Sequence, residues 1–177
     1  MKIVARFEKV SYEEFKSAWI KAHVIDTNRE DKIREIYNNI KLPTRSTKRS
    51  SGYDFYYPDN IAICLNRHKS LTIPTGIRCV FLEDGYDLSI YPRSSMGFKY
   101  RAHIDNTVGI IDNDYFEADN EGHIIIKMSC DPRDASCMTI NPGDKFAQGI
   151  IKEFFLAEGD EEVEKKDRVG GMGSTGK

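Results

Sequence analysis

The chain has 177 residues, of which 40 % are apolar, and a formal net charge of −2. This length and apolar content predict one domain with a buried core, and the charge argues against nucleic-acid binding over the whole surface. The sequence has no uncharged apolar run long enough to span a bilayer, and charges interrupt its N-terminus too early for a secretory signal. We therefore expect a cytoplasmic protein that binds neither membranes nor nucleic acid.

Charge is distributed unevenly along the chain. Residues 1–50 hold 12 Lys and Arg against 7 Asp and Glu, whereas residues 157–167 hold 6 acidic residues and 2 lysines. A short acidic run of this kind is typical of a solvated segment. We interpret it as an exposed tether that leads to the glycine-rich C-terminus.

The four cysteines do not form a metal-binding pattern. They lack a CxxC pair and have no histidine at metal-ligand spacing. Cys64 and Cys79 lie inside apolar runs, where cysteine acts as a small buried hydrophobic residue. We expect Cys64, Cys79, Cys130 and Cys137 all to be reduced thiols, as in a cytoplasmic protein.

The first elements in chain order are a strand at residues 2–9 and a helix that follows it. Ser11 is placed as the N-cap of this helix, and Glu14 would complete a capping box. Val10 and Phe15 have the spacing of a hydrophobic staple across the same helix start.

A second helix is predicted from Thr27, with Glu30 three positions later and Pro43 after its end. Its apolar positions recur at helical spacing: Ile33, Ile36, Tyr37 and Ile40. Two interpretations stay open for this N-terminal region. The helices pack on the core, or, together with the basic segment at residues 41–49, they form a surface for a protein partner.

From residue 52 the pattern changes to short β-rich runs separated by turns. The predicted strands are 53–57, 61–65, 71–73, 77–82, 88–91, 124–128, 138–140 and 146–156. Many short strands at this spacing predict an all-β sandwich or barrel.

Polar clusters lie between these strands, and a glycine-rich segment follows them. The clusters are Ser51–Phe55, Pro92–Gly97, Asn106–Tyr115 and Asn141–Gln148, and the segment is Arg168–Gly176. Glycine backbones allow close approach to a polyanion, and an arginine offers a planar fork of donors to phosphate. Taken alone, the C-terminal segment is equally typical of a flexible terminus.

Taken in order, the five segments resemble the trimeric dUTPase family, and the resemblance covers residues 41–177. It implies hydrolysis of dUTP to dUMP and pyrophosphate, which limits uracil incorporation into DNA and supplies dUMP for dTMP synthesis. It also implies a jelly-roll-like β-barrel at residues 43–157, after an N-terminal elaboration at 1–42 and before an arm at 158–177. In a homotrimer of this kind each active site is composite, with segments from three subunits.

The resemblance implies that Arg93, Ser94 and Ser95 hold the phosphates, with Ser94 also near the bond that breaks. Gln148 resembles the phosphate-contacting glutamine of the family, and Arg168 would hold the terminal phosphates. Taken alone, Pro92–Ser95 is also typical of an ordinary polar turn, and Gln148 of a solvent-facing amide at a strand start.

Hydrolysis of a phosphoanhydride needs a positioned water and a base. Asp112 follows an apolar run, so its carboxylate would emerge at a strand end, and the resemblance implies that it is the base. Asp114 would share a face with it in extended backbone, although Asp-Asn-Asp is equally typical of a turn.

Magnesium is the expected cofactor, because it often binds through the phosphates of a nucleotide and keeps several waters. We expect no dedicated protein cage for it. Asp54 could contact the ion through water.

The uracil and the sugar are assigned to the third segment and to the arm. The resemblance implies that Asn106 and the backbone at Gly109 read the base, and that Tyr115 packs under the deoxyribose; a core tyrosine is the alternative. Met172 stands where the family often has a phenylalanine that covers uracil. In the same arm, Gly173 and Ser174 are expected to contact substrate.

Two rival functions share part of this pattern. A dCTP deaminase, or a bifunctional deaminase and diphosphatase, needs a glutamate in the strand after the third segment, where this chain has Ile124-Ile-Ile-Lys-Met128. A regulatory protein that senses dUTP would bind it without releasing pyrophosphate. The lack of a glutamate in that run argues against deamination, and the presence of Asp112 favours hydrolysis over sensing alone.

Overall fold

The computed structural model of the chain describes residues 2–23, 29–66, 69–132, 137–165 and 170. Its strands are β1 (Ala5–Lys9), β2 (Thr44–Arg45), β3 (Tyr53–Tyr56), β4 (Ile63–Leu65), β5 (Ser70–Pro74), β6 (Ile77–Phe81), β7 (Tyr86–Pro92), β8 (His103–Ile104), β9 (Gly109–Ile111), β10 (Ile125–Ser129), β11 (Met138–Ile140) and β12 (Lys145–Glu153). The helices are α1 (Tyr12–His23), α2 (Glu30–Asn39), α3 (Ser94–Tyr100) and the short 3-10 helices η2 (Tyr115–Glu117) and η3 (Asp160–Glu162). The prediction of an all-β core is confirmed.

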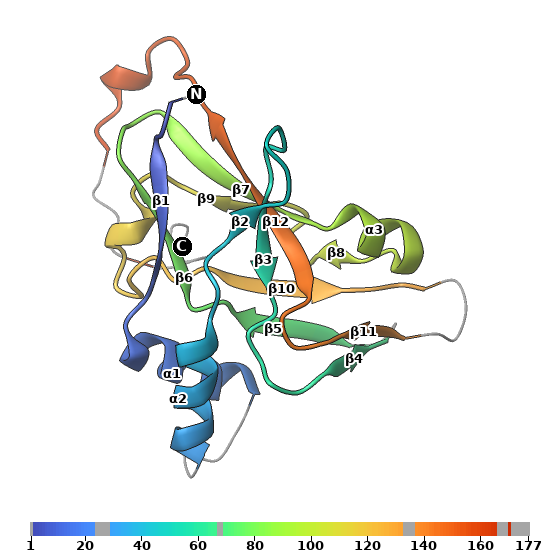
Figure 1. Cartoon of the computed structure of the whole chain (residues 1–177). Helices are drawn as coiled ribbons and strands as arrows, with labels where there is room; N and C mark the ends of the chain where they lie inside the picture. Colours follow the sequence, from blue (N-terminus) through green and yellow to red (C-terminus); the bar gives the residue numbers. More distant parts are fainter. Residues whose placement is uncertain (1, 24–28, 67–68, 133–136, 166–169, 171–177) are drawn as a thin grey trace.

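The strands form four antiparallel sheets around one core (Figure 1). The largest has the order β2-β3-β12-β7-β9, so β12 lies between β3 and β7. A second sheet has the order β5-β10-β8, and two pairs, β1-β6 and β11-β4, complete the barrel. Helices α1 and α2 lie at one end of the barrel, and the chain after β12 passes to the opposite end (Figure 1).

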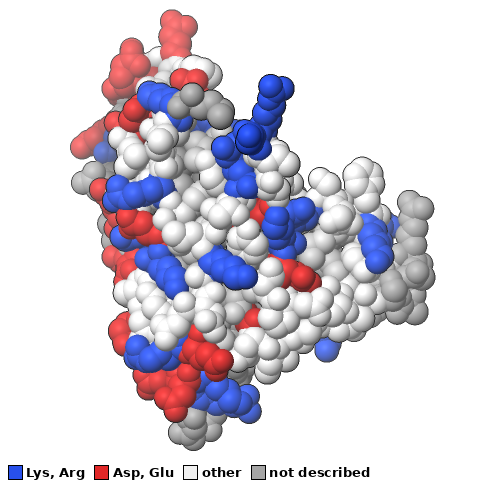
Figure 2. Space-filling model, viewed as in Figure 1, with Lys and Arg blue, Asp and Glu red and all other residues white. Residues whose placement is uncertain are grey.

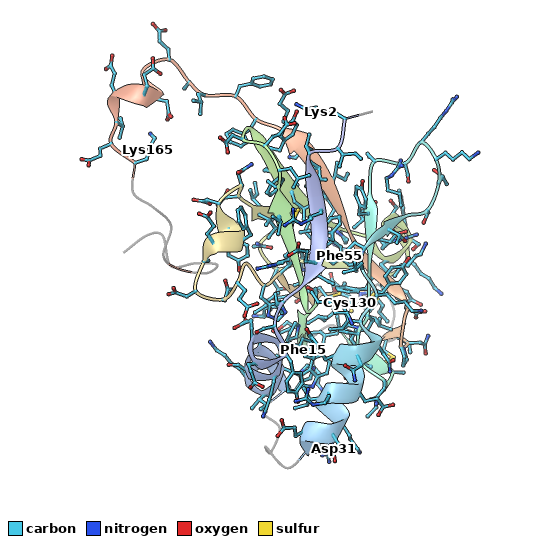
Figure 3. All side chains as sticks on the ribbon, turned by 60° about the vertical axis from the view of Figure 1, so that its left-hand side comes forward. Lys2, Phe15, Asp31, Phe55, Cys130 and Lys165 are labelled. Carbon is cyan, nitrogen blue, oxygen red and sulfur yellow. A yellow bond between two sulfur atoms is a disulfide. The ribbon has the colours of Figure 1, made fainter. Side chains whose placement is uncertain are left out.

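Alternation of apolar and polar residues explains which face of each strand is buried. In β10 Ile126 and Met128 are buried, whereas Lys127 between them is exposed. Phe15 of α1 lies where the helix meets the barrel and Phe55 of β3 lies among the strands, each with at most 1 % of its surface exposed (Figure 3). Burial of each such side chain contributes about 1.5–3 kcal/mol. The alternation of buried and exposed residues, with a period of two, therefore accounts for the predicted strands.

The start of α1 confirms Ser11 as the N-cap, because its Oγ accepts a hydrogen bond from the Glu14 backbone N–H at 3.2 Å. The predicted capping box is wrong, because Glu14 does not accept the bond from the Ser11 backbone N–H. Glu121 instead accepts the bonds from the Ser11 backbone N–H, at 2.7 Å, and from its hydroxyl, at 2.5 Å. Glu14 turns inward to His123. A carboxylate distant in sequence therefore completes the cap.

Helix α2 begins at Glu30, later than predicted, with Arg29 as an N-cap whose side chain makes no capping bond. Thr27 lies outside the described residues. The predicted apolar face is confirmed by the burial of Ile33 and Ile36. The helix therefore packs its apolar stripe inward.

Strand β1 holds the end of α2. The Nζ of Lys9 donates to the carbonyls of Tyr37 and Asn38, at 2.9 and 3.1 Å, and the Tyr37 hydroxyl donates to the Val10 carbonyl at 2.7 Å. Strand β1 also pairs with β6 from Ala5 to Lys9. These contacts favour the first interpretation of the N-terminal region, in which it packs on the core.

The prediction of four reduced thiols is wrong for two of them. Cys64 and Cys137 form a disulfide, whereas Cys79 and Cys130 are free and buried. Cys64 lies in an apolar run, but it is exposed while its neighbour Leu65 is buried. Because Thr139 pairs with Cys64 and Cys137 lies two residues before Thr139, both cysteines lie on the outer face of the β4-β11 pair.

Candidate active site

One pocket gathers three of the predicted segments. We call it the Arg93 pocket; it has a volume of about 360 Å³ and is lined by Ser46, Ser50, Gly52, Asp54, Arg93, Ser94, Ser95 and Gln148. Strand pairing explains the convergence, because Gln148 of β12 lies opposite Asp54 of β3 on one side and Tyr91 of β7 on the other. The central strand of the large sheet therefore assembles the pocket from both neighbours.

Arg93 and Ser94 do not lie in a turn, which corrects the alternative reading of Pro92–Ser95. Strand β7 runs through Pro92, and α3 begins at Ser94, with Arg93 as its N-cap. The backbone N–H groups of Met96 and Gly97 donate to the Arg93 carbonyl, each at 3.0 Å. A helix start leaves its first N–H groups without partners inside the helix. Hydroxyls and a guanidinium therefore meet at a strand-to-helix junction.

Gln148 is the fourth residue of β12 and not a solvent-facing amide at a strand start. Its Nε2 donates to the Pro92 carbonyl at 3.3 Å. A Cβ at Gly52 would come within 2.7 Å of the Gln148 Oε1, so only glycine leaves room for this amide. The resulting orientation presents Gln148 to the pocket.

Charge in the Arg93 pocket is organised around Asp54, which is 4 % exposed. Its Oδ1 accepts a bond from the Arg93 Nη1, and its Oδ2 lies 2.9 Å from the Lys145 Nζ. The Ser46 hydroxyl donates to the same Oδ2 at 2.5 Å. Burial raises the pKa of Asp54, but the bonds from Ser46 and Lys145 and the Arg93 charge outweigh burial and hold the pKa below its ordinary value.

This arrangement favours an anion in the pocket. One carboxylate faces two cations, Arg93 and Lys145, so the group carries an excess positive charge. A guanidinium and hydroxyls are suited to phosphate oxygens. The pocket can therefore hold phosphate groups.

Asp112 lines a second, acidic pocket. This Asp112 pocket has a volume of about 610 Å³ and is lined by Asp84, Gly85, Asp87, Ile110, Asp112, Asn113, Asp114 and Phe154. Asp112 follows β9 directly, as predicted, and is exposed. A carboxylate at this point can hold a water molecule and accept its proton.

The backbone after Asp112 is a turn and not extended. The Tyr115 N–H donates to the Asp112 carbonyl at 3.1 Å, and Asp114 is the N-cap of η2. The Asn113 amide fixes the turn by donating to the carbonyls of Glu83 and Tyr86, at 2.9 and 3.2 Å. The extended reading, in which Asp112 and Asp114 share a face, is wrong.

Tyr115 is a core tyrosine in this structure. It is 2 % exposed, its hydroxyl donates to the His123 carbonyl at 3.0 Å, and the Asn120 amide donates to that hydroxyl at 2.8 Å. Little of its ring is exposed for the predicted packing against a sugar, which stays a prediction. The buried Tyr115 anchors the turn after Asp112 to the core.

Asn106 and Gly109 lie together before Asp112. The exposed Asn106 precedes Thr107, whose φ of 66° marks the tight loop between β8 and β9. A Cβ at Gly109 would meet the Ile90 Cβ at 3.3 Å and the Asn106 Nδ2 at 3.9 Å. The close approach allowed by Gly109 in this chain is therefore toward β7.

The two pockets lie at opposite ends of β7. Ile111 pairs with Leu88, so Asp112 lies beside Asp87, whereas Arg93 follows the last residue of the strand. Asp87 and Arg93 are six positions apart, or about 20 Å in extended backbone. Figure 1 shows the same separation, with the yellow η2 at the left and α3 at the right. A water at Asp112 cannot reach a phosphate held by Arg93 of the same chain.

The C-terminal predictions fall outside the described residues: Arg168, Met172, Gly173 and Ser174. The preceding segment is described through residue 165. It exposes Phe155 and Leu156 and then becomes acidic around η3, where Figure 2 shows acidic side chains gathered at the upper left.

Within the described part of the chain, no group of three or more His, Cys, Asp or Glu side chains is placed to hold a metal ion.

Three residues of the site were not predicted from the sequence: Lys145, Ser46 and Ser50. Ser46 and Ser50 lie in the loop between β2 and β3, from which basic side chains project near the top of Figure 2, to the right of the acidic ones. Lys145 precedes Gln148 by three positions, which would place it on the opposite face of a regular strand.

No helix in the described ranges is both long and apolar enough to cross a membrane.

Comparison with known proteins gives one family. The family profile described as dUTPase matches residues 38–176. The deoxyuridine 5'-triphosphate nucleotidohydrolase of Lactococcus lactis subsp. lactis is 38 % identical over 138 residues, which cover 77 % of this chain and 89 % of that protein. The enzyme of the same name from Helicobacter pylori (strain P12) is 32 % identical over 149 residues, covering 82 % and 95 %.

Solved structures show the same fold. The dUTPase from Streptococcus mutans has a TM-score of 0.56 and 29 % identity, over 69 % of this chain and 91 % of that one. The Staphylococcus bacteriophage 80alpha dUTPase with dUPNHPP has a TM-score of 0.60 and 18 % identity, over 99 % and 96 %. A variant of the dUTPase from phage phi11 of S. aureus, described with a structural Mg(II) ion, has a TM-score of 0.57 and 18 % identity over 94 % and 98 %.

Proposed function

Because the chain belongs to the dUTPase family, we propose that it hydrolyses dUTP to dUMP and pyrophosphate at sites shared between copies of itself. The observation that supports shared sites is the separation of the Arg93 pocket from Asp112 by the length of β7. A second copy that brings its Asp112 to the Arg93 pocket would complete the chemistry. A homotrimer, with the arm of a third copy closing each site, is the assembly that we propose.

In this proposal Arg93, Ser94, Ser95 and Gln148 hold the phosphate chain. The excess positive charge around Asp54 offsets the charge of the triphosphate. Arg168 of the arm would add a second guanidinium at the terminal phosphates, which suits the bidentate geometry of that side chain.

Asp112 acts as the general base. A water held by its carboxylate attacks the α-phosphorus, Asp112 accepts the proton, and the bond to the leaving pyrophosphate breaks. Ser94 lies beside Arg93 in the same pocket, where its hydroxyl can donate to an oxygen near the breaking bond. Because the water attacks in line with the breaking bond, the Asp112 carboxylate must face the α-phosphate from the side opposite the leaving group.

Magnesium enters in this proposal bound to the triphosphate, as part of the substrate. The described residues supply no protein cage for it, and the ion often binds through nucleotide phosphates with several waters retained. Asp54 fits a contact through water. Its Oδ1 accepts a bond from Arg93, and a carboxylate oxygen has room for one more donor.

Recognition of uracil is assigned to the loop at Asn106 and the backbone that continues to Gly109. An exposed amide and backbone N–H and C=O groups can match the acceptor–donor–acceptor edge of the base. Met172, Gly173 and Ser174 would cover the bound nucleotide from the arm. The assignment of Tyr115 to the deoxyribose stays a prediction, since its ring is 2 % exposed in the single chain.

The rival functions have weaker support. Strand β10 reads Ile125-Ile-Lys-Met-Ser129 and has no glutamate for deamination. A protein that only senses dUTP needs no base, whereas Asp112 is exposed in a pocket. We propose a cytoplasmic location from the substrate, a DNA precursor, because the disulfide removes the argument from reduced cysteines.

The test is turnover of each nucleotide by the full chain. The protein is incubated with dUTP, dCTP, dTTP, dATP, dGTP and UTP in magnesium buffer, and pyrophosphate release is measured. We expect efficient release from dUTP alone. Comparable turnover of dCTP or UTP, or binding of dUTP without pyrophosphate, would overturn the proposal.

A further inference from the structure

We infer that Lys145 is a positioning residue of the phosphate site and acts through Asp54 on Arg93. The inference rests on the proposed function, since it concerns the pocket that would hold the triphosphate. Lys145 is not among the residues that line the Arg93 pocket. It is therefore placed to act on a bound anion mainly through the groups that it contacts.

Lys145, Ser46 and Asp54 are all in contact with one another. Its Nζ lies 2.9 Å from the Asp54 Oδ2 and donates to the Ser46 Oγ at 2.7 Å, while the Ser46 hydroxyl donates to that same Oδ2. The other carboxylate oxygen, Oδ1, belongs to Arg93. Asp54 is thus divided between two cations, one on each oxygen.

An irregularity in β12 makes this geometry possible. Lys145 pairs with Tyr56 and Ala147 pairs with Phe55, so two steps along β12 correspond to one step along β3. Such a bulge re-aims the side chains on either side of it. Lys145 and Gln148, three positions apart, therefore both face Asp54, although a regular strand would place them on opposite faces.

The charge balance shows what Lys145 contributes. The Asp54 side chain is 6 % exposed, whereas those of Arg93 and Lys145 are 29 % and 37 % exposed. Without Lys145, the buried carboxylate would neutralise Arg93 alone, and the pair would have no net charge for a phosphate. With Lys145 present, one positive charge remains in excess, and Arg93 keeps donors for the ligand.

The experiment compares Lys145→Met with Lys145→Arg, and with Lys32→Met as a control for charge, because Lys32 is an exposed residue of α2. Binding of α,β-imido-dUTP is titrated by calorimetry, and dUTP turnover is measured separately. We expect Lys145→Met to weaken binding and raise KM by about tenfold or more, with kcat changed far less. Lys145→Arg should restore most of the affinity, and Lys32→Met should match the wild type.

A double-mutant cycle tests whether the effect passes through Asp54. In an Asp54→Asn background, Lys145→Met should weaken binding by a clearly smaller factor than in the wild type, because no carboxylate is left unbalanced beside Arg93. Unchanged binding by Lys145→Met, or fully additive effects in the double variant, would overturn the inference. If the wild type fails to hydrolyse dUTP, the proposed function fails, and the binding titrations still decide the role of Lys145. Melting curves of all variants verify that they are folded.

Discussion

The Nδ1 of His123 lies 3.0 Å from the Glu14 Oε1, and this contact joins helix α1 to the barrel across 109 positions of sequence. The other ring nitrogen, Nε2, accepts a bond from the Gly76 N–H at 2.9 Å. Because Nε2 is the acceptor, the neutral ring carries its proton on Nδ1 and donates it to Glu14. His123 has no exposed surface. A neutral buried imidazole therefore ties α1 to the turn between β5 and β6.

The first prediction concerns stability against pH. Burial lowers the pKa of His123 to about 4, below its ordinary value of 6.5. The unfolded chain then binds more protons than the folded one between these values, so stability falls as pH drops from about 6.5 toward 4. The loss from this group is about 3 kcal/mol. Above about pH 7 the free energy of unfolding no longer depends on pH through His123. Denaturant unfolding at a series of pH values measures it.

His123→Gln is the control for that slope, since it keeps a buried polar side chain that does not titrate. Burial also raises the pKa of the neighbouring Glu14, and its slope has the opposite sign because the folded state takes up a proton more readily. The variant should lose the acid-side slope due to His123. Identical slopes in wild type and variant would show that the pKa of His123 is the same in the folded and the unfolded chain.

The second prediction is that Asp112→Asn abolishes hydrolysis but leaves nucleotide affinity largely intact. The amide cannot accept a proton from water, and loss of a general base costs about 10²–10⁴-fold in rate. Pyrophosphate release and binding of α,β-imido-dUTP are measured on the same preparation. Near-normal turnover would move the base to another residue, with Asp114 the next to test.

The third prediction tests the shared site. A chain truncated after Val163 and a chain with Asp112→Asn should each be nearly inactive as homotrimers. Mixed trimers from co-expression should regain partial activity, because some sites combine an intact Asp112 with an intact arm. A flexible segment of about a dozen residues has a root-mean-square reach of roughly 20 Å, which is comparable to the separation along β7.

The purified mixed assembly must first be shown to contain both chains, for example by two affinity tags. Mixed trimers as inactive as their parents would refute action of the arm across subunits. Full activity of the monomeric chain would refute the shared site altogether.

The fourth prediction concerns packing under the large sheet. A Cβ at Gly149 would lie 2.8 Å from the Leu88 Cδ1 and 3.1 Å from the Phe55 Cε2. Gly149→Ala should therefore destabilise the chain by about 1–3 kcal/mol through overpacking. Gly97→Ala in α3 is the matched control, since a Cβ there would meet the Ala102 carbonyl oxygen at an ordinary contact distance of 3.8 Å.

Alanine also favours helix over glycine, so Gly97→Ala should leave stability unchanged or raise it by up to about 1 kcal/mol. Urea unfolding of the three proteins measures the difference. Equal stability of Gly149→Ala and the wild type would show that Leu88 and Phe55 repack freely.

The sequence supports prediction where a signal is local or repeated. Period-two alternation places Ile126 and Met128 inside, and the Ser11 cap follows from residue type and position. The Arg93 pocket brings together Asp54, Arg93 and Gln148, three residues that the resemblance assigns to the site, and their roles stay predictions.

Prediction failed where a distant residue decides the local outcome. Glu121 takes the capping bonds expected from Glu14, and Cys137 is brought to Cys64 by the pairing of β11 with β4. Lys145 was missed because a bulge changes the face on which it lies. None of these partners has a marker in the sequence near the residue that it contacts.

Strand β12 also bears on which changes of length the chain can accept. Its pairing sets Gln148 opposite both Asp54 and Tyr91, so three stretches far apart in the gene share one frame of alignment. Residues added to a surface loop leave that frame intact, whereas one residue inserted within β12 after Gln148 would shift the rest of the strand by a step and turn inward faces outward. The chain should accordingly tolerate insertions between its strands far better than within this one.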